Sequence, residues 1–588
     1  MTKTPNYTPP YEVDGNCLYL VSRDKHGQAR KKLCNFVPYI VQQVTKNDGV
    51  DSTTWVTLAG IHESGRVLPP TTIRGADLGS TDWVIERWGA DCIPFAGRSV
   101  KEHIRVAIQT TAKDAEKTTI YTVTGWKEID GQWHFLMPGS EDVTVELPGK
   151  LQGYHFERKY SYCDIATAGA LISQWAAPPE VTFTLLAEMF LSPLNHFLRM
   201  AGCEPKFILW LIGKTGSCKS TMAALILSFF GCFTATTLPL SFRDTANSIN
   251  EQCYMTKDLP VVIDDFHPCG HQEQNKMTAT AQNIARNYGD RAGRGRLTAS
   301  CDLMEAKPPQ GNAIITAEFP PDIGESGTAR CFTIELKQGD VDLQTLTSLQ
   351  RLAADGTLNR CGFAYTEWLR ECFLFDKETV KKFIKALRAL FETYRAEFHD
   401  SNKRSHGRVA ENVAWLRMGF HFLLMFLEHH LSYGEAYVTE MEEQFKEMLY
   451  RIACRQSDAI EQDKPTHLFL RKFFSLLESG QIYLKDLSTL HPADFQPGTC
   501  VGYCDNARIY FFADPVHRLV RKLCDDQGEH FTISSRSLLK ALAEEVLIET
   551  FDGQHTKSMH LEGKSRRVVV MDKHKAKVTV EGVCENEA

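Results

Sequence analysis

Residues 207–221 read FILWLIGKTGSCKST, an apolar run that is followed at once by a glycine-bearing loop. The run at 207–212 has the length and composition of a buried strand, and the apolar stretch at 222–230 after the loop is typical of a helix. Backbone N–H groups of such a loop and the N-terminus of the helix form a site for phosphate groups. The segment therefore predicts that the chain binds and hydrolyses a nucleoside triphosphate.

Two positions of the loop have specific expected roles, and a third departs from the usual pattern. Lys219 can reach the β- and γ-phosphates, and the Ser220 hydroxyl can hold Mg²⁺. The pattern G-x-x-x-x-G-K-[ST] has glycine directly before the lysine, where this chain has Cys218. A side chain at a position that needs positive φ costs about 1–2 kcal/mol, and we interpret Cys218 as a tolerated variant. The residues expected to bind ATP are Gly213, Lys214, Thr215, Gly216, Ser217, Cys218, Lys219, Ser220 and Thr221.

A second motif, LPVVIDD at 259–265, supplies the acidic half of the expected site. An apolar run that ends in acids is a buried strand that delivers carboxylates to its C-terminal end, where nucleotide sites lie in open α/β sheets. Asp264 is expected to hold hydrated Mg²⁺ together with Ser220, and Asp265 to orient or deprotonate the attacking water. Two acids after a strand are often only a turn, but behind a phosphate loop they indicate catalysis.

A further strand is predicted at 313–317, and candidate catalytic residues follow it. Thr316 and Glu318 lie at its end, where polar side chains can sense the γ-phosphate. Arg330 follows, and an arginine at that offset can reach a nucleotide bound by a neighbouring subunit. Such an arginine typically contributes about 10³–10⁵ in rate. The alternative is an ordinary surface arginine.

Residues 286–296 read RNYGDRAGRGR, in which arginines are interleaved with glycines. Guanidinium groups without bulky neighbours can contact a phosphate backbone, and the alternative is a solvated loop. The position of this run inside the ATPase core favours nucleic-acid contact. From Arg296 the chain is expected to form a hairpin that returns at 311–316. The predicted DNA contacts are Arg291, Arg294 and Arg296, with Lys307 as a weaker candidate.

Composition limits the class of protein. With 588 residues the chain is expected to hold about four domains. A hydrophobic fraction of 43% and a charged fraction of 24% are those of a soluble globular protein. The formal net charge of −7 means that nucleic acid must be bound by local basic patches. The polar N-terminus is not a signal peptide, the apolar runs are far shorter than the ~20 residues of a membrane span, and the scattered cysteines fit reduced thiols, so a cytoplasmic location is expected.

The pattern of elements predicts an α/β fold with additional domains. The expected domains are a β-rich or α+β domain at 1–155, a parallel-sheet ATPase core with leading helices at 156–340, a helical module at 341–460 and a winged-helix-like domain at 461–588. Within the first domain, β-runs at 120–124 and 133–136 flank Asp130-Gly131, which predicts a hairpin.

The last domain shows the order of elements that a winged helix has. Helices are predicted at 515–525 and 537–546, with a cap near Ser534 or Ser535, and β-runs at 558–561 and 567–571. The same apolar spacing fits the core of any small α+β domain, so DNA binding by this domain stays open. Its basic candidates for DNA contact are Lys564, Arg566 and Arg567.

Taken together, these residues resemble the AAA+ helicases of superfamily 3 character that phages, plasmids and integrative elements carry. In particular the chain looks like a bacterial family whose core is catalogued as a domain of unknown function. The resemblance extends over most of the chain, although only the two nucleotide motifs are specific singly. The other segments that carry it are TGW at 124–126, FRDTAN at 242–247, GRGR at 293–296, SGTAR at 326–330 and SRSLL at 535–539.

The resemblance implies a ring, a homo-hexamer, with ATP between subunits and single-stranded DNA drawn through the centre. It gives Arg330 the role of a finger that acts on the neighbouring subunit, and it makes residues 291–307 the element that faces the pore. In such helicases the strand before the finger usually ends in asparagine. Here Thr316-Ala317-Glu318 stands in that place, so the sensor is either Thr316 or Glu318.

The sequence therefore predicts an ATP- and Mg²⁺-dependent DNA helicase or translocase for the replication of a mobile genetic element. Two other classes stay open. One is an AAA+ protein that remodels proteins, in which single strands would not stimulate ATP turnover. The other is a replication initiator that binds origin DNA and uses ATP as an assembly switch, which the basic residues near the C-terminus motivate.

Overall fold

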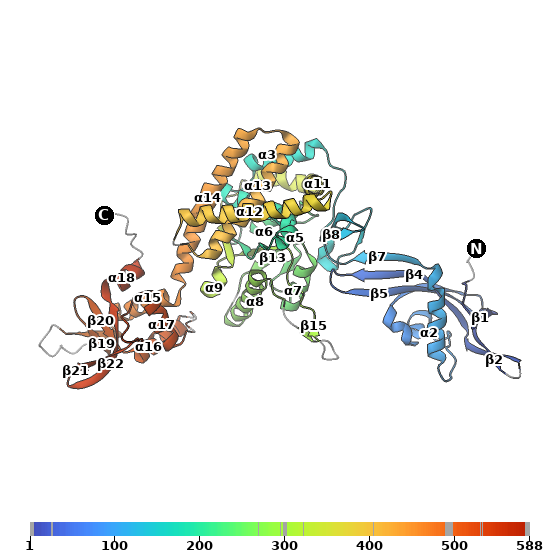
Figure 1. The fold of residues 1–588 in the computed structure, drawn as a ribbon, viewed down its shortest axis with the longest axis horizontal. Helices are drawn as coiled ribbons and strands as arrows, with labels where there is room; N and C mark the ends of the chain where they lie inside the picture. Colours follow the sequence, from blue (N-terminus) through green and yellow to red (C-terminus); the bar gives the residue numbers. More distant parts are fainter. Residues whose placement is uncertain are drawn as a thin grey trace. The chain divides into compact units, whose positions relative to one another are not determined.

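The computed structural model describes residues 5–24, 27–268, 270–293, 296–297, 303–320, 323–403, 405–487, 498–527, 529, 531 and 533–581. The chain forms two compact units (Figure 1). The first consists of residues 1–321, 330–403 and 410–452, and the second of residues 322–329, 404–409 and 453–588. None of the helices in the described ranges combines the length and the apolar character that a membrane crossing requires.

The N-terminal part of the first unit contains two sheets. An antiparallel sheet consists of β1 (Tyr11–Asp14), β2 (Cys17–Asp24) and β3 (Gly27–Cys34). A mixed sheet of order β10-β7-β4-β5-β6 consists of β4 (Phe36–Asn47), β5 (Ser52–His62), β6 (Val67–Arg74), β7 (Glu116–Tyr121) and β10 (Thr144–Val145). Helices α1 (Asp82–Trp88) and α2 (Val100–Thr110) share a core with this sheet that includes Val56, Ile73, Trp83 and Ile104.

The turn predicted at Asp130-Gly131 is present, but one of its two predicted strands was wrong. The turn joins β8 (Gly125–Ile129) to β9 (Gln132–Leu136). Residues 120–121 belong instead to the end of β7, which pairs with β4 and β10. The first strand of the hairpin is anchored to the segment before α5 (Asn195–Met200), because its Trp126 is fully buried and donates its indole N–H to the carbonyl of Pro193 at 2.8 Å.

A parallel sheet forms the centre of the first unit, as the sequence predicts. Its order is β12-β13-β16-β11-β17, and its strands are β11 (Ile208–Ile212), β12 (Leu240–Ser241), β13 (Pro260–Phe266), β16 (Asn312–Ala317) and β17 (Cys331–Glu335). β11 and β16 are buried at every position, which is why such strands read as continuous apolar runs. Because the strands are parallel, their carboxyl ends meet at one edge, where nucleotide ligands bind in α/β sheets.

Helices cover both faces of this sheet. The helices that follow its strands are α6 (Lys219–Leu227), α7 (Ala246–Met255) and α8 (His271–Asp290). Figure 1 shows α6 on one side of β13 and α7 and α8 on the other. The leading helices are α3 (Tyr162–Gln174), α4 (Pro179–Leu191) and α5 (Asn195–Met200). The helical pattern breaks at Pro178 and Pro179 as predicted, with Pro179 in the first turn of α4.

The segment after the sheet is helical, as its periodicity predicts. It consists of α10 (Leu343–Ala354), α11 (Thr357–Phe373), α12 (Lys377–Ser401), α13 (Gly407–Leu431) and α14 (Glu435–Gln462). Gly419 of α13 lies against α4 so closely that a Cβ there would be 2.0 Å from the carbonyl oxygen of Ala187. The close approach of these two helices therefore requires glycine at this position.

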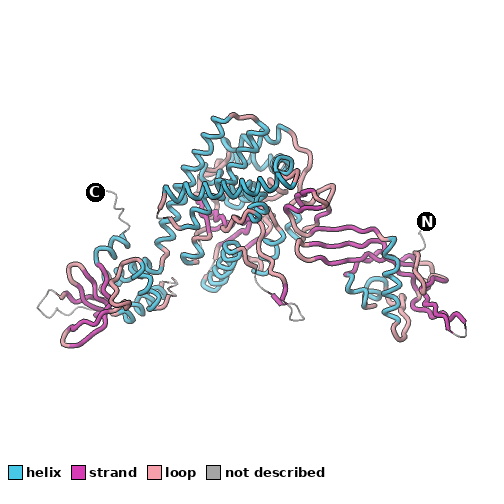
Figure 2. Tube along the Cα trace, viewed as in Figure 1, coloured by secondary structure: helices cyan, strands magenta, loops and turns pink. Residues whose placement is uncertain are grey.

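The second unit is a small α+β domain with α9 (Gly324–Thr328) added from an earlier segment. Its sheet has order β18-β19-β20-β22-β21. The elements are α15 (Pro465–Glu478), β18 (Ile482–Asp486), β19 (Thr499–Cys504), β20 (Arg508–Phe511), α16 (Ala513–Asp526), α17 (Ser535–Glu544), β21 (Lys557–Leu561), β22 (Lys564–Asp572) and α18 (Lys573–Glu581). Figure 2 shows its strands gathered apart from its helices. The Ser534 side chain caps α17 by accepting from the Ser537 N–H, as predicted.

Candidate nucleotide site

The loop between β11 and α6 is shaped by three unusual backbone positions. A Cβ on Gly213 would lie 2.2 Å from the carbonyl oxygen of Leu336, so only glycine fits there. Gly216 and Cys218 both have positive φ, at 86° and 65°. The departure from the glycine pattern therefore falls at a residue in the left-handed region, where a side chain is strained by about 1–2 kcal/mol. The turn delivers Lys219 as the first residue of α6.

A cavity of about 340 Å³ lies at the carboxyl ends of β11, β13 and β16. Its walls come from the phosphate-loop segment, from the end of β13 and from the end of β16. The residues that line it are Thr215, Gly216, Cys218, Lys219, Ser220, Thr221, Asp264, Asp265, Phe266, His267, Thr316, Ala317 and Glu318. Predicted residues from three separate segments therefore share one cavity.

Two hydroxyl groups bind the same carboxylate oxygen in this cavity. The Ser220 hydroxyl donates to Oδ1 of Asp264 at 2.8 Å, and the Thr316 hydroxyl donates to the same atom at 2.5 Å. The Thr316 oxygen also accepts the backbone N–H of Asp265 at 3.1 Å. β16 lies between β11 and β13 in the sheet, so Thr316 comes between the loop and the two acids.

The Asp265 carboxylate has a partner outside this hydroxyl network. The φ of Asp265 is 68°, and the strand pairing shifts register between Ile263 and Phe266. The irregularity interrupts the regular alternation of side chains at this point. The Asp265 carboxylate meets the guanidinium of Arg243 at 3.3 Å. Arg243 is a site residue that the sequence analysis did not single out. The sequence signal that could have identified Arg243 is its position two residues after the short strand β12, whose carboxyl end lies beside that of β13.

Glu318 is held by two partners at the cavity wall. One of its carboxylate oxygens accepts from the Thr215 hydroxyl, and the other lies 2.8 Å from Nδ1 of His267. The Thr215 hydrogen bond holds the pKa of Glu318 below its usual value, assisted by His267 and Lys219. His267 has no role in the sequence analysis, because its contact with Glu318 joins the ends of two different strands.

Lys219 lies between the loop and the acids. Its ammonium donates to the carbonyl oxygen of Lys214 at 3.3 Å. Partial burial lowers the pKa of Lys219, against the opposing effect of the Glu318, Asp264 and Asp265 carboxylates. The negative charge of a bound triphosphate would stabilise the charged form of Lys219 and offset the loss of water that burial causes.

Arg330 lies at the amino-terminal end of the parallel strands, whereas the cavity lies at their carboxyl ends. It precedes the first residue of β17, and its carbonyl accepts from the N–H of Ile208 at the start of β11. Its side chain is buried and forms an ion pair of 2.8 Å with Asp290 at the end of α8. It also fills the space beside Gly289, where a Cβ would lie 2.3 Å from Cδ of Arg330.

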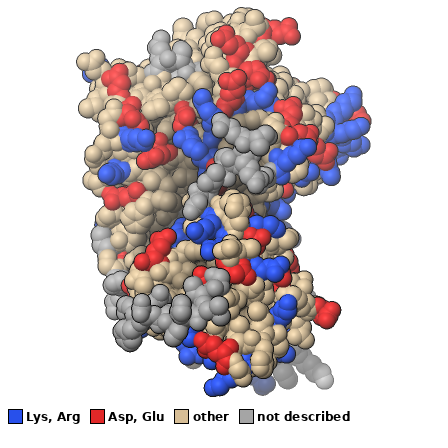
Figure 3. Space-filling model, turned by 90° about the vertical axis from the view of Figure 1, so that its left-hand side faces the viewer, with Lys and Arg blue, Asp and Glu red and all other residues tan. Residues whose placement is uncertain are grey.

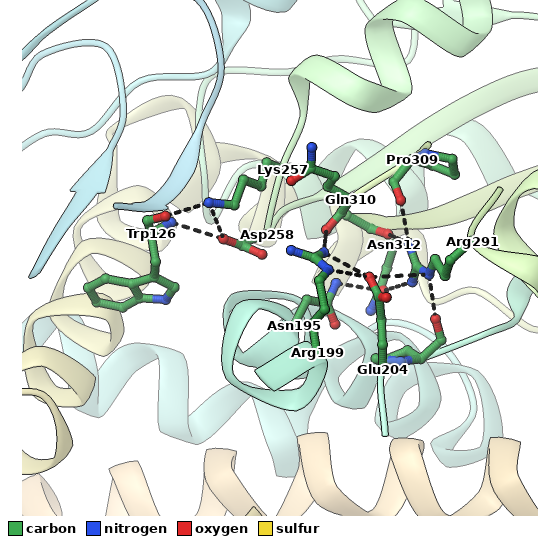
Figure 4. Close-up of polar contacts among 12 residues, drawn as sticks. Trp126, Asn195, Arg199, Glu204, Lys257, Asp258, Arg291, Pro309, Gln310 and Asn312 are labelled. Carbon is green, nitrogen blue, oxygen red and sulfur yellow. Dashed lines mark hydrogen bonds and ion pairs between the residues drawn. The ribbon is translucent and has the colours of Figure 1, made fainter. Parts of the chain in front are cut away.

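Arg291 has a structural role in place of the predicted DNA contact. Its side chain is only 7% exposed and donates to the carbonyl oxygens of Pro205 at 2.7 Å, Pro309 at 3.0 Å and Gly311 at 2.8 Å (Figure 4). Glu204 lies 3.6 Å from its Nε. Because the interior carbonyls occupy its donors, the guanidinium is not available to a phosphate backbone.

The other predicted contacts of this region have different outcomes. Arg294 lies outside the described residues. Arg296 begins β14 (Arg296–Leu297), which pairs with β15 (Leu303–Met304), so the hairpin returns earlier than the predicted 311–316. Lys307 is paired with Asp48 at 2.5 Å and with Asp51 at 3.6 Å. Its ammonium also lies 5.4 Å from the ring centre of Tyr254, so Lys307 joins the N-terminal part to the core instead of presenting a free cation.

The basic candidates of the second unit differ in exposure. Lys564 and Arg567 are exposed on β22. Arg566 is half-buried, and its guanidinium lies 5.5 Å from the ring centre of Phe512. Figure 3 shows one face of the molecule on which basic and acidic side chains are interspersed.

Comparisons with known proteins give a fold but no family. No family model matches the sequence, and no curated protein matches it. The chain is similar to a solved structure titled SCCmec type IV Cch, active helicase, with a TM-score of 0.57 and 13% identity over 99% of this chain and 100% of that chain. A structure of JCV helicase with a bound small molecule covers 39% of this chain and 69% of that chain at 14% identity, and its TM-score of 0.20 supports no argument. The chain therefore has a helicase-like fold over nearly all of its length.

Proposed function

We propose that this chain is an ATP-dependent DNA helicase or translocase with an AAA+ P-loop core, and that it serves the replication of a mobile genetic element. The observation that carries the proposal is the cavity at the carboxyl edge of the sheet, bordered by the glycine-bearing loop, by Lys219 and by the bonded pair Ser220 and Asp264. The helicase-like fold supports the coupling of this site to DNA.

The residues around the cavity fit a magnesium nucleotide. The Ser220 hydroxyl and the Asp264 carboxylate are hard oxygen donors of the kind that Mg²⁺ prefers. Mg²⁺ commonly takes only one or two protein oxygens besides phosphate and water, which agrees with the absence, among the described residues, of a cluster of three or more His, Cys, Asp or Glu side chains that could hold a metal. When bound, Mg²⁺ would neutralise charge on the β- and γ-phosphate oxygens.

Each side chain of the site then has a separate task. Lys219, at the N-terminus of α6, would bind the β- and γ-phosphates. The Asp265 carboxylate accepts no hydrogen bond from Ser220 or Thr316, so it would orient the attacking water once Arg243 is displaced from it. Thr316 contacts both acids and is the better candidate for the sensor than Glu318, whose oxygens are occupied by Thr215 and His267.

The proposal includes a homo-hexameric ring in which Arg330 acts on the nucleotide of a neighbouring subunit. The position of Arg330 at the sheet edge opposite its own cavity favours action on another chain, and its pair with Asp290 would have to open first. Arg330→Ala chains mixed with Asp264→Ala chains test this arrangement. Recovery of ATP turnover in the mixture is expected, and a mixture as inactive as its components would remove the action between subunits.

The proposed activity is tested by the rate of ATP hydrolysis with and without single-stranded DNA, together with strand displacement on a forked duplex. Stimulation by single strands and unwinding are expected. Hydrolysis that DNA does not change would favour the remodelling of proteins instead.

A second candidate function is origin binding with ATP as an assembly switch. The exposed Lys564 and Arg567 on the strand β22 favour it, because a winged-helix-like domain can place such residues on duplex DNA. Sequence-selective duplex binding without unwinding would support this candidate over the helicase.

A further inference from the structure

The mixed sheet of the N-terminal part has one face that the proposed ATPase does not use. Val56 of β5 and Ile73 of β6 are buried in the core shared with α1 and α2. Because side chains alternate along a strand, the residues directly before and after Val56 and Ile73 point to the other face of the sheet. The strand register agrees, since Trp55 pairs with Arg74 and Thr57 with Thr72. We call the following residues the outer sheet face: Gln42, Val44, Lys46, Thr53, Trp55, Thr57, Thr72, Arg74 and the exposed Glu116.

This face is polar and open to solvent around one aromatic ring. Thr53, Thr72 and Arg74 are exposed, and Trp55 is half-buried on β5 in the middle of the face. The ring pairs across the strands with Val44 of β4, which is buried. The half-buried Trp55 therefore leaves part of its ring open to solvent, where another flat group can stack on it.

The position of the Trp55 ring is set by polar neighbours. Its indole N–H donates to the Thr53 hydroxyl at 3.3 Å. The Lys46 ammonium lies 5.5 Å and the Arg74 guanidinium 5.7 Å from the ring centre. Both distances are close to the ~6 Å limit of a cation–π contact, so each cation can leave the ring at small cost. Lys46 also forms a solvent-exposed pair with Glu146 at 3.3 Å, which binds it only weakly.

We propose that the outer sheet face binds single-stranded DNA, with Trp55 stacking on a base and with Lys46 and Arg74 contacting the flanking phosphates. An aromatic ring on an open sheet with cations beside it is the arrangement that takes unpaired bases, because every base has a flat face for stacking. The threonine hydroxyls add donors and acceptors for phosphates and base edges. A duplex does not fit this face in the same way, because its bases are already stacked on one another.

This inference goes beyond the proposed ATPase, because the site lies outside the nucleotide cavity and needs no nucleotide. Binding is therefore measured without ATP, on the full chain, and also on the Lys219→Ala chain. Unimpaired DNA binding by Lys219→Ala is expected. If the chain did not hydrolyse ATP, the proposal of a DNA site on this face would be unaffected. If the chain did not bind DNA on this face, the proposal of an ATPase would be unaffected.

The position of the contact is tested by photocrosslinking. The probe is an oligonucleotide of about 16 deoxythymidines in which single positions carry bromodeoxyuridine, a length within the range of single-strand sites. Irradiation of the complex with the full chain is expected to attach the probe to Trp55, as read by mass spectrometry of the peptides. Attachment only to segments outside β4, β5 and β6 would overturn the proposal.

The energetics are tested with variants of the same face. Trp55→Ala is expected to weaken binding of the deoxythymidine probe by about 5- to 150-fold, and Trp55→Phe, which keeps a ring, to weaken it much less. The pair Lys46→Ala and Arg74→Ala is expected to flatten the salt dependence by about 0.7 in logarithmic slope for each phosphate that the protein no longer neutralises. Lys117→Ala is the matched control, because Lys117 is exposed on the same sheet but pairs with Gln43 on the core side.

Three outcomes would overturn the assignment. The first is unchanged DNA binding and unchanged crosslinking in the folded chain that carries both Lys46→Ala and Arg74→Ala. The second is equal weakening of DNA binding in that chain and in Lys117→Ala. The third is tighter binding of a uridine RNA probe than of the DNA probe. Lys46 and Arg74 lie on the surface, so the double variant Lys46→Ala, Arg74→Ala is expected to fold. The proposal can therefore be tested even if Trp55→Ala does not fold.

Discussion

The Ser220 hydroxyl donates a 2.8 Å hydrogen bond to Oδ1 of Asp264. Ser220 stands in the first turn of α6, and Asp264 stands near the end of β13. Thr316, at the end of β16, donates to the same oxygen. Three segments that are distant in the chain therefore converge on one carboxylate, and two hydroxyl groups hold that carboxylate in place at the proposed Mg²⁺ site.

Lys219→Ala should reduce ATP turnover by about 100-fold or more, because it removes the cation that faces the phosphates in a partly buried cavity. The matched control is Lys276→Ala, which removes an exposed lysine of α8 that does not line the cavity and should retain most of the activity. Steady-state phosphate release measures both. Similar rates for Lys219→Ala and the unchanged chain would remove the phosphate-loop assignment.

Thr316→Val should lower the turnover number by about 10- to 100-fold, because it deletes a hydrogen bond to a charged carboxylate and leaves the N–H of Asp265 without its acceptor. Thr316→Ser keeps the hydroxyl and should remain close to the unchanged chain. Single-turnover kinetics separate this effect from nucleotide binding. If Glu318→Gln reduces turnover and Thr316→Val does not, Glu318 is the sensor.

Gly289→Ala should destabilise the first unit by about 1–3 kcal/mol, since the new methyl group would overlap the Arg330 side chain, whose Cδ lies 2.3 Å from the Cβ position. Gly79→Ala is the control, because nothing lies within 4 Å of its Cβ position. Thermal unfolding followed by calorimetry compares the two. Equal melting temperatures would mean that Arg330 is not fixed beside Gly289.

The sequence alone predicted the elements whose signals are local. The apolar runs before the loop and before the two acids became β11 and β13, and the Ser534 cap became the start of α17. The environment of Arg291 could not be predicted in this way, because its acceptors come from Pro205 and from the segment after the hairpin. From the sequence alone, an arginine in a glycine-rich run is predicted to be exposed. Only the folded structure shows that distant carbonyl groups surround the guanidinium of Arg291.

The same reason explains the outcome for Lys307. Its partner Asp48 belongs to the turn between β4 and β5, far away in the chain, and no periodic pattern connects the two. The contact between Arg243 and Asp265 could not be predicted either, because it joins the segment after β12 to the end of β13.

The pair of Lys307 and Asp48 should stabilise the protein in a defined pH window. Burial raises the pKa of Asp48, but hydrogen bonds from Lys307 and from the backbone N–H groups of Asp51 and Val50 outweigh it and lower the pKa below 3.8. Burial likewise opposes the charge of Lys307, but Asp48 raises its pKa above 10.5. The stabilisation is therefore present between about pH 4 and pH 10, is lost as the pH falls through the folded pKa of Asp48, and is lost again as it rises through that of Lys307.

Asp48→Asn should accordingly lower stability by about 1 kcal/mol or less at pH 7, with a difference that disappears in acid. Melting temperatures over a pH series measure this effect. Glu378→Gln is the control, because its pair with Lys381 is 70% and 73% exposed and should contribute almost nothing. A pH-independent difference for Asp48→Asn would mean that the charge pair is not the cause.

The most direct test of the account is the rate of Mg²⁺-dependent ATP hydrolysis by the full chain, measured with and without single-stranded DNA, with the mass of the assembly determined in the same buffer. We predict hydrolysis that single strands accelerate, that Lys219→Ala abolishes and that accompanies a mass of several subunits. A chain that binds no ATP and releases no phosphate under these conditions, with or without DNA, would contradict it.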